Sequence, residues 1–293
     1  MIKSYLILLR PKQWIKNLII FAALVFSKNL FDLQYVLLTT MAFVIFCILS
    51  SAVYIMNDVR DLEQDRLHPW KRTRPIASGE VPVPHALLLS LCFMIISAFA
   101  SFAMNKQLFL LVLIYLVMQI AYTFVLKQIV LLDIIVIAIG FVLRAVAGAV
   151  SINVGISDWL LLCAFLLALF LGFCKRRQEL VIHEENDAST FRPVLTQYSP
   201  DLLDALISVV TGATVLAYAI YTVWPETVLK FGTHQLLYTL PFVVYGIFRY
   251  LYLVHKQDKG DSPTRVLLTD LSLQINLLAW LLCAVLILYF NRV

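Results

Sequence analysis

Charged residues are scarce in this chain, and their scarcity excludes the soluble globular class. Only 14% of the 293 residues are Asp, Glu, Lys or Arg, whereas 61% are hydrophobic. Soluble domains carry about 25% charged residues. We therefore expect an integral membrane protein. The chain also lacks a basic stretch interleaved with aromatic residues, so no nucleic-acid partner is expected.

Several catalytic and structural motifs are missing as well. The five cysteines are scattered in or beside apolar segments without paired spacing, which argues against a disulfide or zinc framework. There is no glycine-rich phosphate loop, and no Ser-His-Asp or Cys-His arrangement can be assembled. The basic start merges into an apolar segment without a small-residue cleavage site, so no cleavable signal peptide is expected. If the protein is an enzyme, we therefore expect a reaction that uses no covalent protein nucleophile.

Long apolar segments are abundant and indicate the fold. A helix needs about 20 apolar residues to cross a bilayer. The sequence predicts an all-α polytopic membrane protein, a single domain over residues 1–293, with nine transmembrane helices around a cavity open to the cytoplasmic side. The nine candidate segments are 15–33, 34–56, 84–104, 107–126, 129–151, 158–174, 202–223, 233–254 and 267–290.

Lysine and arginine gather on one side of these segments. With the N-terminus inside, only Lys28, Lys106, Lys230 and Arg292 fall on the outer side, and most of the 23 basic residues fall on the inner side. The positive-inside rule then predicts a multi-pass protein of the cell (inner) membrane with a cytoplasmic N-terminus and an outer C-terminus. Two long inner loops are expected, at 57–83 and 175–201.

An acidic run follows the second apolar segment. Residues 34–56 carry no charge, and carboxylates then appear at Asp58, Asp61 and Asp65. Spacings of three and four place them on one helical face, where like charges repel. The helix macrodipole also disfavours them at a C-terminus. Clustered oxygen ligands suit a hard divalent cation, Mg²⁺ above all. The alternative is a solvated helix end at the membrane interface.

Basic residues follow the acidic run within the first inner loop. Lys71, Arg72 and Arg74 lie just beyond it and indicate a site for metal-bound phosphate, because guanidinium groups match phosphate oxygens. Positive-inside anchoring is the alternative, and it accounts for part of Lys71 and Arg72. His68 is expected to be a loop residue and not a ligand.

The second inner loop opens with Lys175, Arg176 and Arg177. Three adjacent residues cannot share one helix face, so one or two are expected to point into the cavity, with snorkelling to lipid headgroups as the alternative. The acidic residues at 184, 185 and 187 are expected to form a solvated loop.

Arg144 lies inside the fifth apolar segment, 11 residues after Asp133 and so about 16 Å deeper. A charge near mid-membrane costs at least ~2.5–3.5 kcal/mol and must face a cavity or a partner. We expect it to face the cavity, with a structural ion pair as the alternative. Four further residues are candidates for the cytoplasmic rim of the cavity: Tyr122, Lys127, Lys16 and Asn17. For the last two, simple anchoring is an equal alternative.

The run Asn-Asp-x-x-Asp-x-x-x-Asp from Asn57, followed by Arg-Pro-Ile-Ala-Ser-Gly from Arg74, resembles the first signature of the UbiA-type membrane prenyltransferase superfamily. The resemblance implies a nine-helix membrane fold in which this motif holds Mg²⁺ and a diphosphate. Most members carry a second Asp-x-x-x-Asp motif after the sixth helix. This chain has Lys-Arg-Arg-Gln-Glu over residues 175–179 instead.

Other motifs resemble one branch of that superfamily, whose members move phosphoribosyl from phosphoribosyl pyrophosphate (PRPP) to a polyprenyl phosphate for cell-wall arabinan synthesis. The motifs begin at Arg10, Tyr122, Gly140, Lys175, Arg192 and Ser262. The implied activity is that of an Mg²⁺-dependent glycosyltransferase, with Asp58 and Asp61 catalytic. The implied metal ligands are Asn57, Asp58, Asp61 and Asp65. The implied substrate-binding residues are Lys16, Asn17, Tyr54, Arg74, Tyr122, Lys127, Arg144, Lys175, Arg176, Arg177 and Glu179.

Two other functions stay open at this stage. One is a prenyltransferase that joins a polyprenyl diphosphate to an aromatic acceptor, with Glu179 and Glu184 replacing the missing aspartates. The other is a transporter with a carboxylate cation site. The polyprenyl chain length and the oligomeric state, a homo-oligomer included, do not follow from the sequence.

Overall fold

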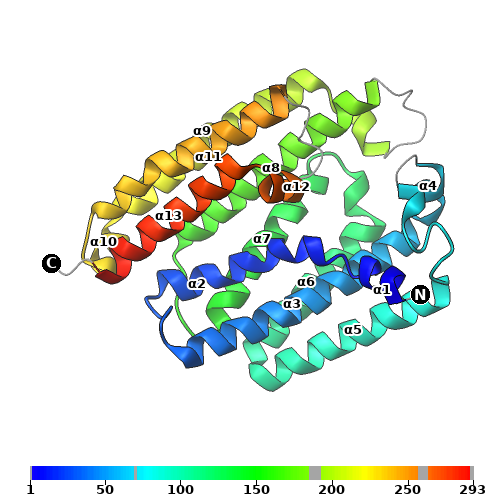
Figure 1. The fold of residues 1–293 in the computed structure, drawn as a ribbon, viewed down its shortest axis with the longest axis horizontal. Helices are drawn as coiled ribbons and strands as arrows, with labels where there is room; N and C mark the ends of the chain where they lie inside the picture. The colour runs from blue at the N-terminus through cyan, green and yellow to red at the C-terminus, as the bar shows by residue number, and fades with distance from the viewer. Residues whose placement is uncertain (1, 69–70, 185–192, 257–262, 291–293) are drawn as a thin grey trace.

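The computed structural model describes residues 2–68, 71–184, 193–256 and 263–290, and it is helical throughout (Figure 1). Within these ranges eight segments are long and apolar enough to cross a membrane. They are α3 (Leu33–Arg60), α5 (Val83–Met104), α6 (Lys106–Phe124), α7 (Leu132–Ser151), α8 (Asp158–Glu184), α9 (Pro200–Val223), η5 with α11 (Gln235–Thr239 and Leu240–Lys256), and α13 (Leu271–Phe290). The predicted all-α polytopic membrane class is confirmed.

The expected first span, 15–33, is not a single α-helix. It consists of a 3₁₀ helix, η1 (Pro11–Ile20), followed by the short α2 (Phe21–Phe26). At about 2.0 Å per residue in η1 and 1.5 Å in α2, the pair covers about 29 Å, close to the thickness of the hydrocarbon core. Arg10 contacts Asp58 at one end of α3, and the Leu30 N–H donates to the Tyr289 hydroxyl at the end of α13. The segment therefore runs the length of the bundle.

Helix α7 allows η1 to approach very closely. A Cβ atom at Gly148 would lie 2.0 Å from the Ile20 carbonyl oxygen. Only glycine fits there, because any side chain would push the two backbones apart. The extended 3₁₀ segment is thus held against α7 at a point where no larger residue is tolerated.

The sixth span is longer than expected. Helix α8 runs to Glu184, so Lys175–Glu179 lie on a helix and the prediction of a loop starting at 175 is wrong. The charged residues continue the helix because Arg176 and Arg177 find acidic partners on neighbouring elements. Lys, Arg, Gln and Glu are also good helix formers. The predicted acidic loop at 185 and 187 and the motif at Arg192 lie outside the described residues.

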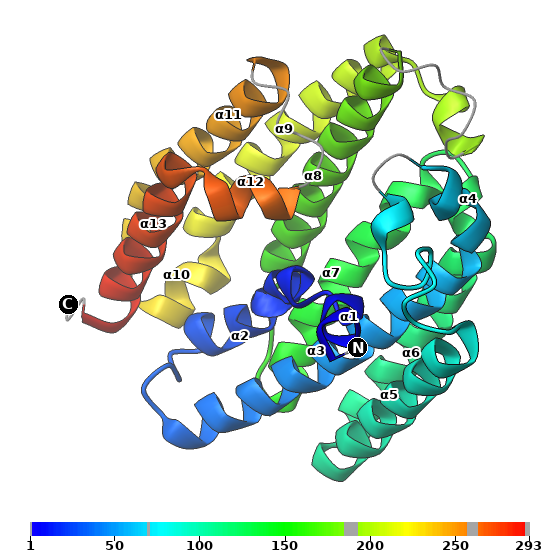
Figure 2. The same cartoon turned by 45° about the vertical axis from the view of Figure 1, so that its right-hand side comes forward.

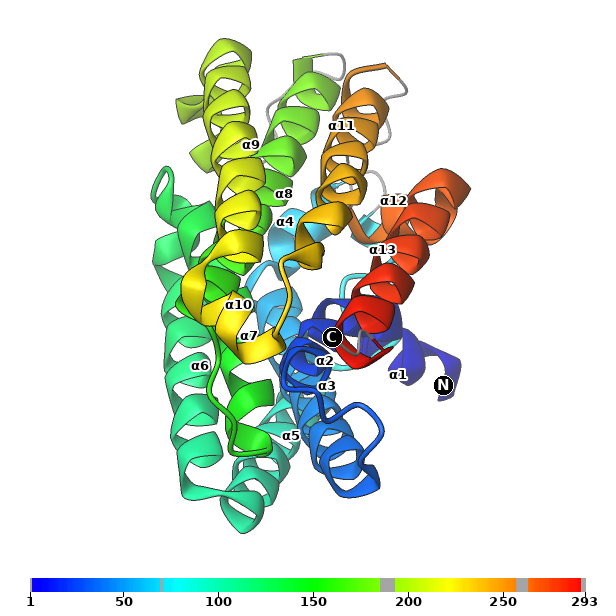
Figure 3. The same cartoon turned by 90° about the vertical axis from the view of Figure 1, so that its left-hand side faces the viewer.

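The two ends of the bundle carry different short elements. Figures 1 and 2 place α4 (Leu62–Leu67) beyond the C-terminal end of α3, while the last turn of α13 lies at the opposite end. The short α1 (Ile2–Leu8) packs against α3 near its α4 end, since Leu8 and Ile55 share a buried cluster. Helix α12 (Pro263–Thr269) directly precedes α13 and packs against α13 and η1 (Figure 3).

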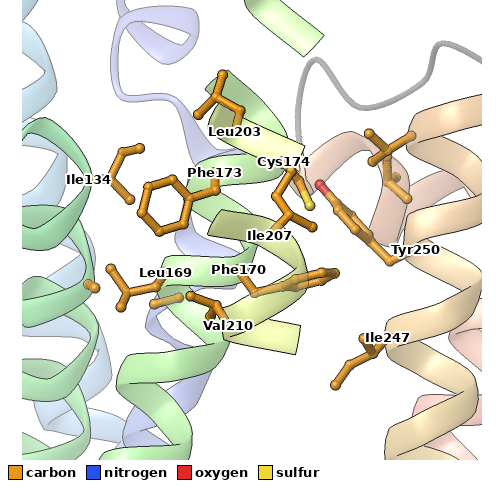
Figure 4. Packing of buried hydrophobic residues seen from close by; sticks show 14 of the residues in the cluster. Ile134, Leu169, Phe170, Phe173, Cys174, Leu203, Ile207, Val210, Ile247 and Tyr250 are labelled. Atoms are coloured by element: carbon orange, nitrogen blue, oxygen red, sulfur yellow. The ribbon is translucent and has the colours of Figure 1, made fainter. Parts of the chain in front are cut away.

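Two hydrophobic clusters flank α7. On one side, Ile134 packs with Phe170 and Phe173 of α8, with residues of α9, and with Tyr250 of α11 (Figure 4). On the other side, Ala147 packs with residues of α3 and α6. Figure 3 shows α8, α9 and α11 gathered apart from α5 and α6. In a membrane, close packing holds such helices together more than burial of apolar surface does. Helix α7 is therefore the shared wall between two packed groups.

Candidate active site and substrate cavity

The acidic residues lie where α3 ends. Asn57 and Asp58 are in its last turn, Asp61 is the C-cap, and Asp65 belongs to α4. The Asp61 N–H donates to the Asn57 carbonyl at 2.9 Å and the Asp65 N–H to the Asp61 carbonyl at 2.8 Å. These i,i+4 bonds preserve helical spacing across the break. The acidic face predicted on one helix is thus built by two consecutive helices.

Three basic side chains neutralise this acidic face. Arg74 Nη1 donates to Asp58 Oδ1 at 3.0 Å and to Asp65 Oδ2 at 2.6 Å. Arg10 also pairs with Asp58, which is only 3% exposed. Buried carboxylates are tolerated only when they are paired in this way. Burial raises the pKa of the Asp65 carboxyl although Arg74 opposes the rise, and the neighbouring Asp58 adds to it.

Lys127 is the third cation. It lies in η3 (Leu126–Gln128), the single turn after α6, and its Nζ donates to Asp61 Oδ1 at 2.5 Å and to Asn57 Oδ1 at 3.1 Å. One positive charge thus already lies between two oxygens of the motif. These residues fit Mg²⁺ chemically, because amide and carboxylate oxygens are the ligands that it prefers. In their present positions no three carboxylate, His or Cys side chains of the described residues are arranged to hold a metal. Arg10, Arg74 and Lys127 contact these carboxylates in this arrangement.

A cavity of about 550 Å³ opens beside this face. Cavities of this size hold small ligands. Its walls are polar near α4 and apolar deeper down, where Ile137, Phe141 and Leu171 line it. Of the predicted site residues, the lining includes Lys16, Tyr54, Asn57, Asp61, Asp65, Arg74, Tyr122, Arg144, Lys175, Arg176 and Glu179. Asp58 and Lys127 contact these lining residues directly.

Arg144 lies deep in the cavity wall, as expected. Its Nη2 donates to the Tyr115 hydroxyl at 2.7 Å, and its guanidinium lies 5.2 Å from the Tyr115 ring centroid and 5.1 Å from that of Phe141. The residue is 6% exposed, and within the described ranges its Nε has no hydrogen-bond partner and no carboxylate pairs with it. A buried cation without a counter-ion, in the wall of a cavity, is suited to bind an anion there.

Arg176, in contrast, is neutralised within the protein. Its Nε donates to Asp133 Oδ2 at 2.6 Å, and its Nη1 contacts Glu179. The Tyr198 hydroxyl donates to the other Asp133 oxygen at 2.7 Å. Burial, together with this hydrogen bond, raises the pKa of Tyr198, so the hydroxyl stays protonated. This network joins α7, α8 and the segment after η4 (Pro193–Gln197), and it leaves Arg176 less free to hold a phosphate.

Besides Lys127, two predicted substrate-binding residues lie outside the cavity lining. Arg177 turns to α9 and pairs with both oxygens of Asp204, so its predicted role as a substrate ligand is not supported. The step of 100° per residue along α8 is what sends Arg176 and Arg177 to different neighbours. Asn17 is 1% exposed and donates to Ser50 Oγ at 3.3 Å. It is therefore a buried packing residue and not a rim residue.

Sequence reasoning missed several residues of the wall. Arg10 was assigned only to a motif, yet it pairs with Asp58 and lies 5.1 Å from the Tyr54 ring centroid. His68 follows α4 as the predicted loop residue, but it is 8% exposed and lines the cavity, which the sequence did not predict. Gln119, on the same face of α6 as Tyr115 and Tyr122, lines it too. The i,i+4 spacing of Tyr115 and Gln119 was the signal that could have found Gln119.

Comparisons with known proteins place the chain in a family. The UbiA prenyltransferase family matches residues 18–278. The chain is 35% identical over 286 residues to decaprenyl-phosphate phosphoribosyltransferase of Corynebacterium glutamicum, covering 96% of this chain and 85% of that protein. It is also 35% identical over 277 residues to the enzyme of the same name from Mycobacterium tuberculosis, covering 93% and 90%.

Solved structures agree on the fold. A UbiA homologue from Archaeoglobus fulgidus bound to GPP and Mg²⁺ superposes with a TM-score of 0.72 at 20% identity, covering 97% of this chain and 99% of the other. At that identity the likeness concerns the fold alone. Together with the family match over most of the chain, it leads to one conclusion: this protein is a member of the UbiA prenyltransferase family.

Proposed function

We propose that this protein transfers 5-phosphoribosyl from PRPP to a polyprenyl phosphate and releases pyrophosphate, at the cytoplasmic face of the cell (inner) membrane. Such a step supplies precursors for cell-wall arabinan. The observation that carries the proposal is an acidic face paired with Arg10, Arg74 and Lys127 beside a cavity. The same cavity is lined by Arg144, which pairs with no carboxylate of the described residues. The names of the 35% identical relatives support it.

The acidic face is the proposed site of the leaving group. Asp58 and Asp61, supported by Asn57 and Asp65, would hold Mg²⁺, which neutralises charge on the departing pyrophosphate. Lys127 and Arg74 already contact these carboxylates and therefore lie within reach of phosphate oxygens. Cations so placed stabilise the charge that grows on the leaving oxygen as the bond to C1 breaks.

Arg144 is the proposed anchor of the lipid phosphate. It is buried about 16 Å below Asp133 along α7, and its free Nε is an unused donor. The lipid phosphate is already anionic, so its attack on C1 needs no general base. The neighbouring apolar wall, with Ile137 and Leu171, suits the first isoprene units of the lipid. The cavity of about 550 Å³ suits a small ligand, so the rest of a long polyprenyl chain extends beyond it.

The alternative, prenyl transfer from a polyprenyl diphosphate, needs carboxylates on α8 to hold a second metal-bound phosphate. Glu179 is engaged by Arg176 and lies 3.4 Å from Lys175 Nζ. In the described part of α8, Lys175 and Arg176 thus lie at the positions where prenyl transfer would need carboxylates to bind a second metal ion. This disposition favours the phosphoribosyl donor.

The deciding experiment compares two donor and acceptor pairs on the same membranes. One sample receives labelled PRPP with polyprenyl phosphate, and the other receives polyprenyl diphosphate with hydroxybenzoate, both with Mg²⁺. We expect a lipid-linked product in the first sample and no prenylated hydroxybenzoate in the second. Product only in the second reverses the assignment, and cation uptake without any release of pyrophosphate indicates a transporter.

A further inference from the structure

Lys127 occupies the position of a cation within the acidic motif. Its ammonium lies 2.5 Å from Asp61 Oδ1 and 3.1 Å from Asn57 Oδ1, and only 11% of the side chain is exposed. Asn57 and Asp61 are one helical turn apart, so both oxygens reach the same point. We propose that Lys127 is an exchangeable counter-ion of the metal site, which the metal displaces only when a diphosphate is present to receive the ammonium. This inference rests on the metal site of the proposed function.

The contact of Lys127 and metal coordination by the same oxygens exclude one another. Mg²⁺ binds oxygen at about 2.0–2.1 Å. A metal bound to the oxygens of Asn57 and Asp61 would therefore lie beside the Lys127 ammonium. The two positive charges would be only a few ångströms apart, and they would repel one another strongly. The ammonium also uses oxygen lone pairs that the metal needs. A free divalent ion must consequently expel Lys127 before it can bind.

A diphosphate changes this balance. Lysine carries its charge on a flexible four-carbon stem with three rotatable donors, so the ammonium can turn to a new anion while η3 stays in place. Phosphate oxygens bound with the metal offer such an anion within one side-chain length. Arg74 lies in the same situation, because it bridges Asp58 and Asp65. Metal and diphosphate are therefore expected to bind as one unit, with weak binding of either alone.

The test measures Mn²⁺ binding to the purified full-length protein by electron paramagnetic resonance, with and without inorganic pyrophosphate. We expect Lys127→Met to bind Mn²⁺ alone at least about tenfold more tightly than the wild type, since one charged hydrogen bond is worth about that factor. Pyrophosphate is expected to strengthen Mn²⁺ binding strongly in the wild type and much less in the variant. Lys127→Arg keeps the charge and is expected to resemble the wild type.

The matched control is Lys106→Met, which removes an exposed lysine at the opposite end of α6 and should leave Mn²⁺ binding unchanged. If Lys127→Met is poorly folded by its unfolding midpoint, Lys127→Gln takes its place. Equal Mn²⁺ affinity of the wild type and the folded neutral variant, without pyrophosphate, overturns the proposal. The assay uses neither PRPP nor lipid, so a failure of phosphoribosyl transfer leaves this result intact and the two failures are distinguishable.

Discussion

Replacing Arg144 with Met tests the assignment of the deep end of the cavity. The change removes a guanidinium that donates to the Tyr115 hydroxyl and lies over the Tyr115 and Phe141 rings, and it keeps an apolar side chain of similar length. If the guanidinium binds the lipid phosphate, its loss removes at least one charge-assisted hydrogen bond, worth about 1.5–3 kcal/mol. That energy corresponds to a loss of about 10- to 150-fold in kcat/KM for the lipid acceptor.

Stability is expected to change much less than activity. Burial of the charge costs at least ~2.5–3.5 kcal/mol at mid-membrane, and the substitution removes this cost. It also removes one hydrogen bond of about 1 kcal/mol and two cation–π contacts of about 0.5–2 kcal/mol each. These terms nearly cancel, so the unfolding midpoint of Arg144→Met should lie close to that of the wild type.

The assay is initial-rate kinetics with each substrate varied while the other is saturating. We expect the KM for polyprenyl phosphate to rise and the KM for PRPP to stay within about twofold, because the Arg144 guanidinium contacts Tyr115 and Phe141 and none of the carboxylates of the acidic face. Arg177→Met, which removes a guanidinium paired with Asp204 outside the cavity, is the matched control. A rise in the KM for PRPP with unchanged acceptor kinetics would refute the reasoning and assign Arg144 to the donor.

Three further changes test other parts of the structure. Asp61→Asn, which removes the charge facing Lys127, should reduce Mg²⁺-dependent pyrophosphate release at least about 100-fold, and the unfolding midpoint of the variant is measured alongside to show that it is folded. Asp133→Leu leaves the buried Arg176 without its partner on α7 and should cost about 3–5 kcal/mol of unfolding free energy, which the double variant with Arg176→Met should largely restore. Gly148→Ala places a methyl group against the Ile20 carbonyl, so its unfolding midpoint should fall clearly, and an unchanged midpoint contradicts the close approach of η1 and α7.

The sequence was sufficient for features that depend on local spacing. Long apolar runs predict membrane helices because a bilayer demands about 20 apolar residues per crossing. Spacings of three and four place Asp58, Asp61 and Asp65 together because backbone hydrogen bonds keep the helical period through the end of α3. The depth of Arg144 follows from the helical rise alone. Each of these properties is fixed by residues close together in the chain.

Tertiary structure alone decided which charges on different helices meet. Arg10 and Lys127 pair with carboxylates 48 and 66 residues away, and no local pattern links them. Likewise, helical geometry makes Arg176 and Arg177 point in different directions. Only the packing of α7 and α9 against α8 places Asp133 beside Arg176 and Asp204 beside Arg177. The sequence therefore determined which residues lie at the ends of the apolar helices and how far along a helix a charge such as that of Arg144 lies. The packing of the helices decided which cation neutralises which carboxylate, because ion pairs form between side chains that long-range contacts bring within about 4 Å.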